Sequence, residues 1–298
     1  MELKRKEIVG TQRGPHLLIT GGVHGDEFEP MAAVRQLMRE VAADQLRGRL
    51  TLVPVVNEPA YLRGHRTAED GLDLARTCPG RADGSVTERI AWALSNLIRS
   101  VNYYIDLHSG GTTLCVWPLA GYMLHPDAEV RKRQQQMATA FNLPVVWGTD
   151  CRLNGRSLSV ARDARVPAIY AEYHGSGLCD PSGIRAYMEG CLNVLAVLDM
   201  IDRPLPPSRR EYLVEDEREG SGHMQVCNPA PVTGFFQPHV QPGSQIDVGA
   251  PLGVICDVLG DRPITVPSRQ RGIVVVLRTF SFVRESESLA VIMETDRP

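Results

Sequence analysis

The chain has 298 residues, 43% hydrophobic and 22% charged, a composition typical of a globular protein with a substantial core rather than a disordered chain. Its formal net charge of −3 predicts no basic surface for nucleic acid or an anionic membrane, so a small-molecule partner is expected. The seven cysteines form no CxxC pair, the first residues carry no apolar signal segment, and no apolar run approaches the roughly 20 residues of a membrane span, so we expect a cytoplasmic location.

Short apolar runs alternate with helical patterns through the first two thirds of the chain. Apolar spacing predicts a helix that begins near Pro30, and the capping-box sequence Ser85-Val86-Thr87-Glu88 predicts the start of another. Further helices are predicted near 130–141 and 184–201, and strands at 17–20, 50–56, 101–107, 144–146 and 168–171. This alternation predicts an α/β fold with a mixed, largely parallel sheet sandwiched by helices.

A proline-rich segment that begins at Arg203 interrupts the last helical pattern and predicts a linker. Beyond it, short β-type runs alternate with Pro-Gly turns. We therefore expect an α/β domain over residues 1–204, which carries the chemistry, and a smaller all-β C-terminal domain over residues 205–298.

Two stretches of the predicted C-terminal domain, 249–255 and 286–292, resemble each other, as expected of a domain built from two similar halves. The pattern resembles the lipoyl/biotinyl-like half-barrel, which carries its cofactor on a hairpin lysine. No lysine follows Lys132, so attachment of such a cofactor is excluded.

Candidate metal ligands follow two of the predicted strands. His24-Gly25-Asp26-Glu27 lies after the run 17–20, and His108 ends the run 101–107. A histidine and a glutamate three residues apart on a tight turn bind one ion from the same side, and a distant histidine completes a set with an open position, which is typical of catalytic zinc. Because ligands of α/β sheets bind at the carboxyl ends of the strands, we expect one zinc ion per chain at this edge.

Glu172 follows the run 168–171 and is predicted to reach the same edge. An unpaired buried carboxylate is unfavourable, so Glu172 either pairs with an arginine or acts as a general base that passes a proton from water to a leaving amine. Its position at a strand end favours the base. Asp106, two residues before His108, either holds a ligand histidine in place or contacts neighbouring backbone.

The segment 57–80 is polar, rich in arginine and too long for a simple turn, which favours a functional loop. Arginine stabilises the oxyanion of a tetrahedral intermediate or holds a carboxylate with two hydrogen bonds. The arginine candidates for such roles are Arg63, Arg66 and Arg76, and Asn57 is a further candidate for substrate binding. Solvated surface charge is a stronger alternative for Arg63 than for the other two arginines.

Four motifs together resemble the succinylglutamate desuccinylase/aspartoacylase family, zinc acylases related to the zinc carboxypeptidases. They are Gly-Gly-x-His-Gly-Asp-Glu at 21–27, the Asn-x-Pro, Arg and Asp-Leu-x-Arg-x-x-Pro-Gly stretch at 57–80, Asp-Leu-His at 106–108, and the later Glu172. The resemblance implies zinc held by His24, Glu27 and His108, water activated by Glu172, the scissile carbonyl polarised by Arg66, and the substrate carboxylate held by Arg76. We also expect Arg63 and Asn57 to bind substrate.

The resemblance spans nearly the whole chain, including the C-terminal β domain, and implies a zinc carboxypeptidase-like fold. One departure is clear. The family usually has Asp-Leu-Asn-Arg, whereas this chain has Asp73-Leu74-Ala75-Arg76 and so lacks an amide that would help Arg76 to hold a carboxylate.

We therefore predict a zinc-dependent amidohydrolase that removes an N-acyl group from a small amino-acid-like substrate. The alternatives are a metallocarboxypeptidase acting on short peptides and a catalytically lapsed protein that binds small ligands through a retained metal. The C-terminal domain argues against the first, because the resemblance places it over the site. The complete ligand and base set argues against the second, whereas Ala75 keeps it open. A homo-oligomer is compatible with the sequence.

Overall fold

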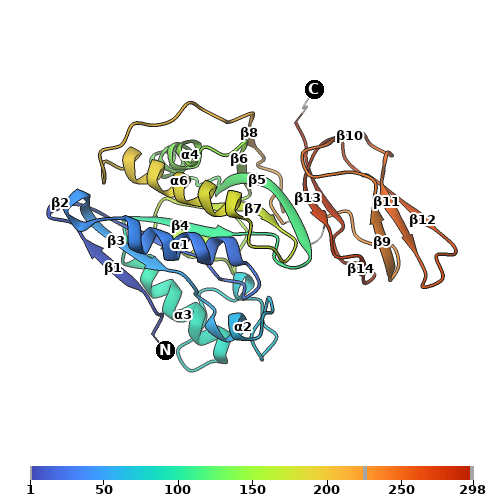
Figure 1. Cartoon of the computed structure of the whole chain (residues 1–298), viewed down its shortest axis with the longest axis horizontal. Coiled ribbons are helices and arrows are strands. Elements are labelled where there is room, and N and C mark those ends of the chain that lie inside the picture. Colours follow the sequence, from blue (N-terminus) through green and yellow to red (C-terminus); the bar gives the residue numbers. More distant parts are fainter. Residues whose placement is uncertain (1, 224–226, 296–298) are drawn as a thin grey trace.

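A run of parallel strands lies at the centre of the larger lobe of the computed structural model (Figure 1), which describes residues 2–223 and 227–295. The sheet runs in the order β1-β3-β2-β4-β7-β5, parallel from β3 to β7 and antiparallel at its β1/β3 and β7/β5 steps. Beyond β5, the strands β6 and β8 continue in parallel. The bounds are β1 Lys6–Val9, β2 Gln12–Thr20, β3 Arg47–Val53, β4 Tyr103–His108, β5 Leu114–Met123, β6 Val145–Thr149, β7 Ala168–Gly175 and β8 Tyr212–Glu215.

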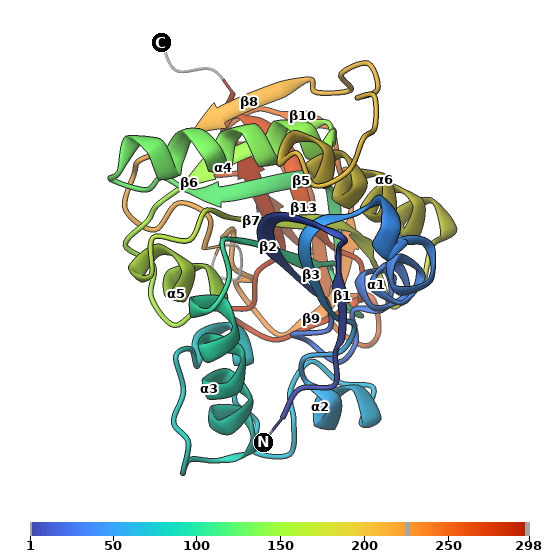
Figure 2. The same cartoon turned by 90° about the vertical axis from the view of Figure 1, so that its left-hand side faces the viewer.

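Helices cover both faces of this sheet (Figure 2). Helices α1, α4 and α6 pack on one face, against side chains such as Ile19, Ile105 and Ile169, while α3 and α5 pack on the other, against Leu18 and Tyr104. Among the described residues, no helix has the length and apolar character needed to cross a bilayer. The bounds are α1 Phe28–Glu40, α2 Glu58–Leu62, α3 Val86–Arg99, α4 Ala128–Phe141, α5 Ser157–Asp163 and α6 Pro181–Val197, with 3₁₀ turns η1 Ala43–Gln45 and η2 Leu74–Arg76.

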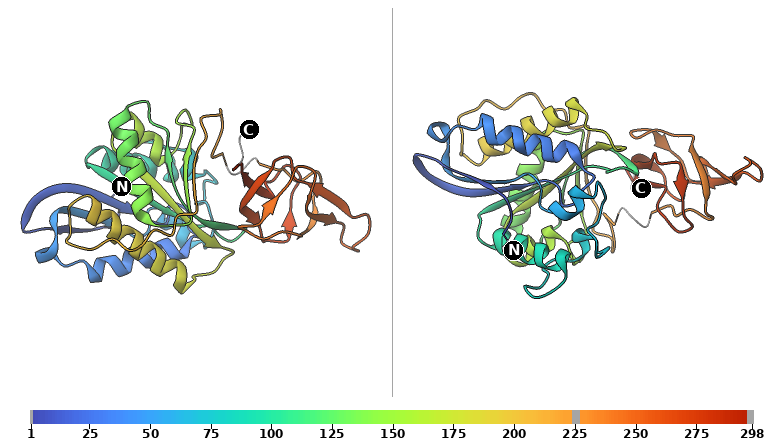
Figure 3. Two further views of the ribbon diagram at one scale, coloured as in Figure 1. Left: turned by 90° about the horizontal axis from the view of Figure 1, so that it is seen from above. Right: turned by 60° about the horizontal axis from the view of Figure 1, so that its bottom comes forward.

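The smaller lobe is built from C-terminal strands and is joined to the larger one through β5 (Figure 3). Strands β12, β11, β9 and β14 form a separate four-stranded antiparallel sheet. Strand β13 instead pairs with the first residues of β5, and it also carries β10 and β15. The bounds are β9 Gly234–Pro238, β10 Gln245–Ile246, β11 Pro251–Cys256, β12 Ile264–Pro267, β13 Gly272–Arg278, β14 Phe282–Val283 and β15 Ala290–Met293.

Local sequence signals account for several of these elements. The Ser85 side chain accepts a hydrogen bond from the Glu88 backbone, and Glu88 accepts one from the Ser85 backbone, so the predicted capping box starts α3. Pro30 lies in the first turn of α1, where a missing N–H leaves no helical bond unmade. The predicted α/β class, with its largely parallel sheet and a separate antiparallel sheet at the C-terminus, is confirmed.

Other expectations needed correction. The predicted strand 168–171 ends too early, because β7 continues to Gly175, and Glu172 therefore lies within the strand rather than after it. Strand β5 was not predicted, since Pro118 and Gly121 interrupt its apolar pattern. The domain boundary after residue 204 stays a prediction, and the structure pairs β8, which lies beyond that boundary, with β6 of the main sheet.

Candidate metal centre and active site

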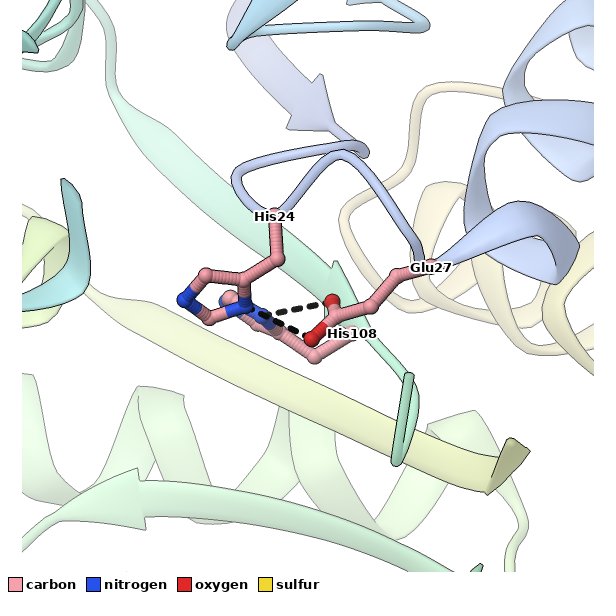
Figure 4. Close-up of side chains that lie close together, drawn as sticks. All are labelled: His24, Glu27 and His108. Carbon is pink, nitrogen blue, oxygen red and sulfur yellow. Dashed lines mark hydrogen bonds and ion pairs between the residues drawn. The ribbon is translucent and has the colours of Figure 1, made fainter. Parts of the chain in front are cut away.

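Two histidines and a glutamate converge at the carboxyl end of the parallel strands. His24 and Glu27 lie in the loop between β2 and α1, and His108 is the last residue of β4. One ligand atom from each of the three residues lies within 4.8 Å of the others. Figure 4 shows the Glu27 carboxylate beside both rings. One of its oxygens lies 2.6 Å from His24 Nδ1 and the other lies 3.1 Å from His108 Nδ1.

The far nitrogen of each ring contacts a different aspartate. His24 Nε2 lies 3.1 Å from Asp73, and His108 Nε2 lies 3.2 Å from Asp106. A histidine that donates its Nε2 hydrogen to a carboxylate keeps Nδ1 as a free lone pair for a metal ion. Both rings thus direct the same type of nitrogen at the same point.

The chemistry of this donor set fits a zinc ion. Glu27 is buried, which by itself raises its pKa, but the adjacent His24 and His108 outweigh burial and hold the pKa well below its usual range. The Ser109 backbone N–H also donates to Glu27, at 3.2 Å. An ionised glutamate between two imidazole nitrogens is a ligand set that zinc enzymes use.

Asp106 connects the ligand His108 to the interior of the protein. It is fully buried, and it accepts hydrogen bonds from Thr20 Oγ1 at 2.7 Å and from Ser157 Oγ. The structure therefore favours the histidine-orienting alternative for Asp106 over a contact with neighbouring backbone.

Asp26 lies between His24 and Glu27 in the sequence, and its side chain binds the loop that follows His108 rather than facing the metal position. Its Oδ2 accepts hydrogen bonds from the Thr112 backbone and hydroxyl at 3.0 and 2.9 Å. Gly111 in that loop has φ +58°, and a Cβ there would lie 2.7 Å from Asp26 Oδ2. The His24–Glu27 turn is thus fastened to the loop that follows His108.

Glu172 is the register partner of His108 across β4 and β7. Burial raises the pKa of Glu172 to about 8, although the nearby His108 acts in the opposite direction. Because residues two apart in a strand share a face, Glu172 lies on the same face of β7 as Tyr170, and both line the cavity described below.

Arg66 reaches the site through Asp73. One guanidinium nitrogen of Arg66 lies 3.0 Å from Asp73, and another lies 3.8 Å from Glu27. The Asp73 carboxylate therefore contacts both Arg66 and the ligand His24, and these two groups hold its pKa far below the usual range despite burial. The sequence motif contained Asp73 but did not reveal this bridging position.

A cavity of about 110 Å³ opens beside the ligand group, and it is lined by His24, Glu27, His108, Glu172, Arg66 and Arg76. It is also lined by Arg156, which sequence reasoning missed because no spacing rule connects the start of α5 to this site. Burial and, after it, the charge of Arg156 lower the pKa of Arg76 to about 10.

Two predicted substrate-binding residues lie outside the described lining of the cavity. Asn57 is buried, and its side chain caps α2 by accepting a hydrogen bond from the Ala60 backbone at 3.3 Å. Arg63 ends the same helix and is exposed. Their roles in substrate binding stay predictions without support from this geometry.

Known proteins are similar to this chain in sequence and fold. Residues 13–198 match the succinylglutamate desuccinylase/aspartoacylase catalytic domain. N-alpha-acetyl-L-2,4-diaminobutyric acid deacetylase from Halomonas elongata is 30% identical over 294 residues, 96% of this chain and 84% of that protein. The succinylglutamate desuccinylase/aspartoacylase structure from Rhodobacter sphaeroides has a TM-score of 0.88 and 26% identity over 100% of this chain and 90% of that one. For the product-bound ectoine utilization protein EutE (DoeB) from Ruegeria pomeroyi, the TM-score is 0.87 and the identity 26%, covering 98% and 88% of the two chains. This chain therefore belongs to the succinylglutamate desuccinylase/aspartoacylase family.

Proposed function

We propose that this protein is a zinc-dependent deacylase that hydrolyses the amide bond of a small N-acyl amino acid, with one zinc ion per chain. The observation that carries the proposal is the meeting of the His24, Glu27 and His108 group with Glu172 and the arginines in one cavity. The name of the Halomonas elongata relative, a deacetylase of an N-acetylated amino acid, supports the same class of reaction.

His24, Glu27 and His108 would hold the zinc ion. When bound, zinc supplies a Lewis acid that polarises the scissile carbonyl and makes a water molecule acidic enough to attack it. The contacts of Asp73 and Asp106 with the far ring nitrogens would keep both histidine rings aimed at the ion.

Glu172 is the proposed proton carrier. A general base works best when its pKa lies near the operating pH, and burial raises the pKa of Glu172 from that of an ordinary carboxyl to about 8. Glu172 takes a proton from the attacking water and gives it to the leaving amine nitrogen. Arg66, held by Asp73, donates hydrogen bonds to the oxyanion that develops on the carbonyl oxygen.

Arg76 and Arg156 are the proposed carboxylate site. Burial is the main cause of the lowered pKa of each, and for Arg76 the charge of Arg156 adds to it. A substrate carboxylate would offset that repulsion and accept hydrogen bonds from both groups. Arg156 thus supplies a second donor where Ala75 lacks the amide of the family pattern.

No observation favours the two alternative functions. Val276 of β13 lines the cavity, so the C-terminal lobe closes it on one side, which suits a small substrate better than a peptide chain. The candidate ligands, base and arginines all line the cavity, which counts against a lapsed enzyme, and the one departure from the family pattern is Ala75. A cytoplasmic location and a homo-oligomer stay predictions. All seven cysteines lie in the described residues and are free thiols.

A screen of N-acetyl, N-propionyl and N-succinyl amino acids tests the proposal, with the released amine detected by ninhydrin and bound zinc by elemental analysis. The zinc-loaded protein is expected to hydrolyse at least one compound, and the Glu172→Gln variant to bind zinc without turnover. If zinc-loaded protein releases no amine from any compound, the proposed reaction is wrong.

A further inference from the structure

Tyr170 lies on β7 two residues before Glu172. Its register partners are Asp106 on β4 and Gly121 on β5. Partners in register project to the same face of a sheet, and Tyr170 shares that face with Glu172, two residues along β7. The tyrosine ring therefore stands beside the proposed base and on the cavity side of the sheet.

The ring lies directly over the backbone of Gly121. A Cβ on residue 121 would be 2.2 Å from two ring carbons of Tyr170 and 2.4 Å from its hydroxyl oxygen. Only glycine leaves room for the ring at this depth, so any larger residue at position 121 would push the ring outward. Tyr170 lines the cavity of about 110 Å³, so we expect a displaced ring to reduce the space inside it.

The surroundings of Tyr170 hold it in this position. Its ring packs against two apolar clusters of the core, one containing Tyr104 and the other Trp147. Burial and the charge of Glu172 raise the pKa of the Tyr170 hydroxyl, whereas Arg156 and Thr149 partly oppose this effect. The hydroxyl is thus neutral, and Tyr170 lines the same cavity as Arg156.

We propose that Tyr170, seated over Gly121, determines substrate specificity by limiting the size of the amino-acid side chain that fits beside Arg156. The proposal rests on the deacylase function, in which Arg76 and Arg156 hold the carboxylate of the amino-acid half. Tyr170 and Arg156 line the same cavity, so in this proposal the ring lies beside that half of the substrate rather than the acyl half.

Two substrate series separate the two halves. The first series varies the amino acid and consists of the N-acetyl derivatives of alanine, 2-aminobutyrate, norvaline and norleucine. The second varies the acyl group and consists of N-acetyl-, N-propionyl- and N-butyryl-alanine. Tyr170→Ala is expected to raise the ratio of kcat/KM for norleucine over alanine by about tenfold or more, because one or two methylenes carry that much discrimination. Tyr170→Phe, which keeps the ring, should stay near the wild-type ratio, as should the acyl series in every variant.

Gly121→Ala gives the opposite test, because it should move the ring into the cavity and lower the same ratio. Introduced into the wild-type chain, Gly121→Ala should also lower the Tm. In the Tyr170→Ala background the drop in Tm should be smaller, because no ring is displaced. Zinc content and Tm of each variant show whether it is folded.

The two proposals fail differently. If wild-type protein hydrolyses none of the compounds, the deacylase function is wrong, and size selection is then read from calorimetric binding of the same compounds to the zinc-loaded variants. An unchanged norleucine-to-alanine ratio in folded Tyr170→Ala, in turnover or, without turnover, in binding, overturns the role of Tyr170. A shift in the acyl series instead also overturns it.

Discussion

His108 and Glu172 are direct partners in the parallel register of β4 and β7. A candidate ligand histidine and the proposed base therefore lie side by side on one face of a buried sheet, and no flexible loop lies between them. The main-chain hydrogen bonds of two central strands set their separation, which is the kind of rigid support that catalytic geometry needs.

Changing Glu172 to glutamine tests the base directly. The amide keeps the size of the side chain but cannot accept a proton, so kcat is expected to fall about 10²–10⁴-fold while KM and zinc content stay near wild type. Glu189→Gln is a matched control, because the Glu189 side chain is 59% exposed on α6. Both variants are compared by steady-state kinetics. An unchanged kcat in Glu172→Gln would show that the role of Glu172 is structural.

Asp106 is expected to act on the metal through His108. Asp106→Asn removes the charge that orients the His108 ring, so zinc affinity should fall about 10–100-fold, measured by competition with a chelator. Ser157→Ala should produce a smaller loss, because Asp106 keeps its bond from Thr20. Asp163→Asn, on an exposed carboxylate, should leave zinc affinity unchanged. Equal affinities for Asp106→Asn and wild type would contradict this role.

Arg76 and Arg156 are expected to bind the carboxylate of the substrate. Arg76→Ala and Arg156→Ala should each raise KM about 10–100-fold for a free acid, the loss expected for a hydrogen bond to a charged group. The effect on the corresponding methyl amide should be far smaller. Arg165→Ala serves as the surface control, since its side chain is 68% exposed. Equal effects on acid and amide would show that the arginines are structural.

Asp70 fastens the arginine-rich loop to the start of α3, and this contact predicts a pH dependence. It accepts hydrogen bonds from Ser85 Oγ at 2.6 Å and from the Thr87 N–H and hydroxyl at 2.9 and 2.7 Å. Burial raises the pKa of Asp70, but these bonds lower it more, so the folded pKa lies below its unfolded value of about 3.9. The stabilisation is therefore complete above the unfolded pKa and is lost as the pH falls through the folded pKa.

Asp70→Asn is accordingly expected to reduce the free energy of unfolding by about 1 kcal/mol or more at pH 7. The difference from wild type should shrink as the pH falls below about 3.9. Urea denaturation across a pH series measures both values, with exposed Asp44→Asn as the control. A difference that does not change with pH would show that the Asp70 charge contributes nothing.

The convergence of the candidate metal ligands was predictable because they follow apolar runs that form strands. His24 comes after β2 and His108 ends β4, so the general rule for strand ends was sufficient to bring them together. Glu172 was also placed at this edge, although β7 continues past it to Gly175. Its closeness to His108 depends on the register of the two strands, which one sequence does not specify.

Arg156 and Tyr170 were missed for a physical reason. Arg156 precedes α5 and reaches the cavity only because α5 packs on the sheet, a contact far apart in sequence. The position of Tyr170 depends on antiparallel pairing with Gly121 of β5, a strand hidden by Pro118 in its middle. Tertiary contacts of this kind carry no local signature.

Titration of metal-free protein with zinc, followed by turnover of an N-acyl amino acid, tests the central claim most directly. Protein stripped by a chelator is expected to be inactive, to regain activity in proportion to added zinc, and to reach a plateau at about one zinc ion per chain, as a single His₂Glu site requires. Full activity without metal, or a zinc-saturated protein that hydrolyses no N-acyl amino acid, would contradict it.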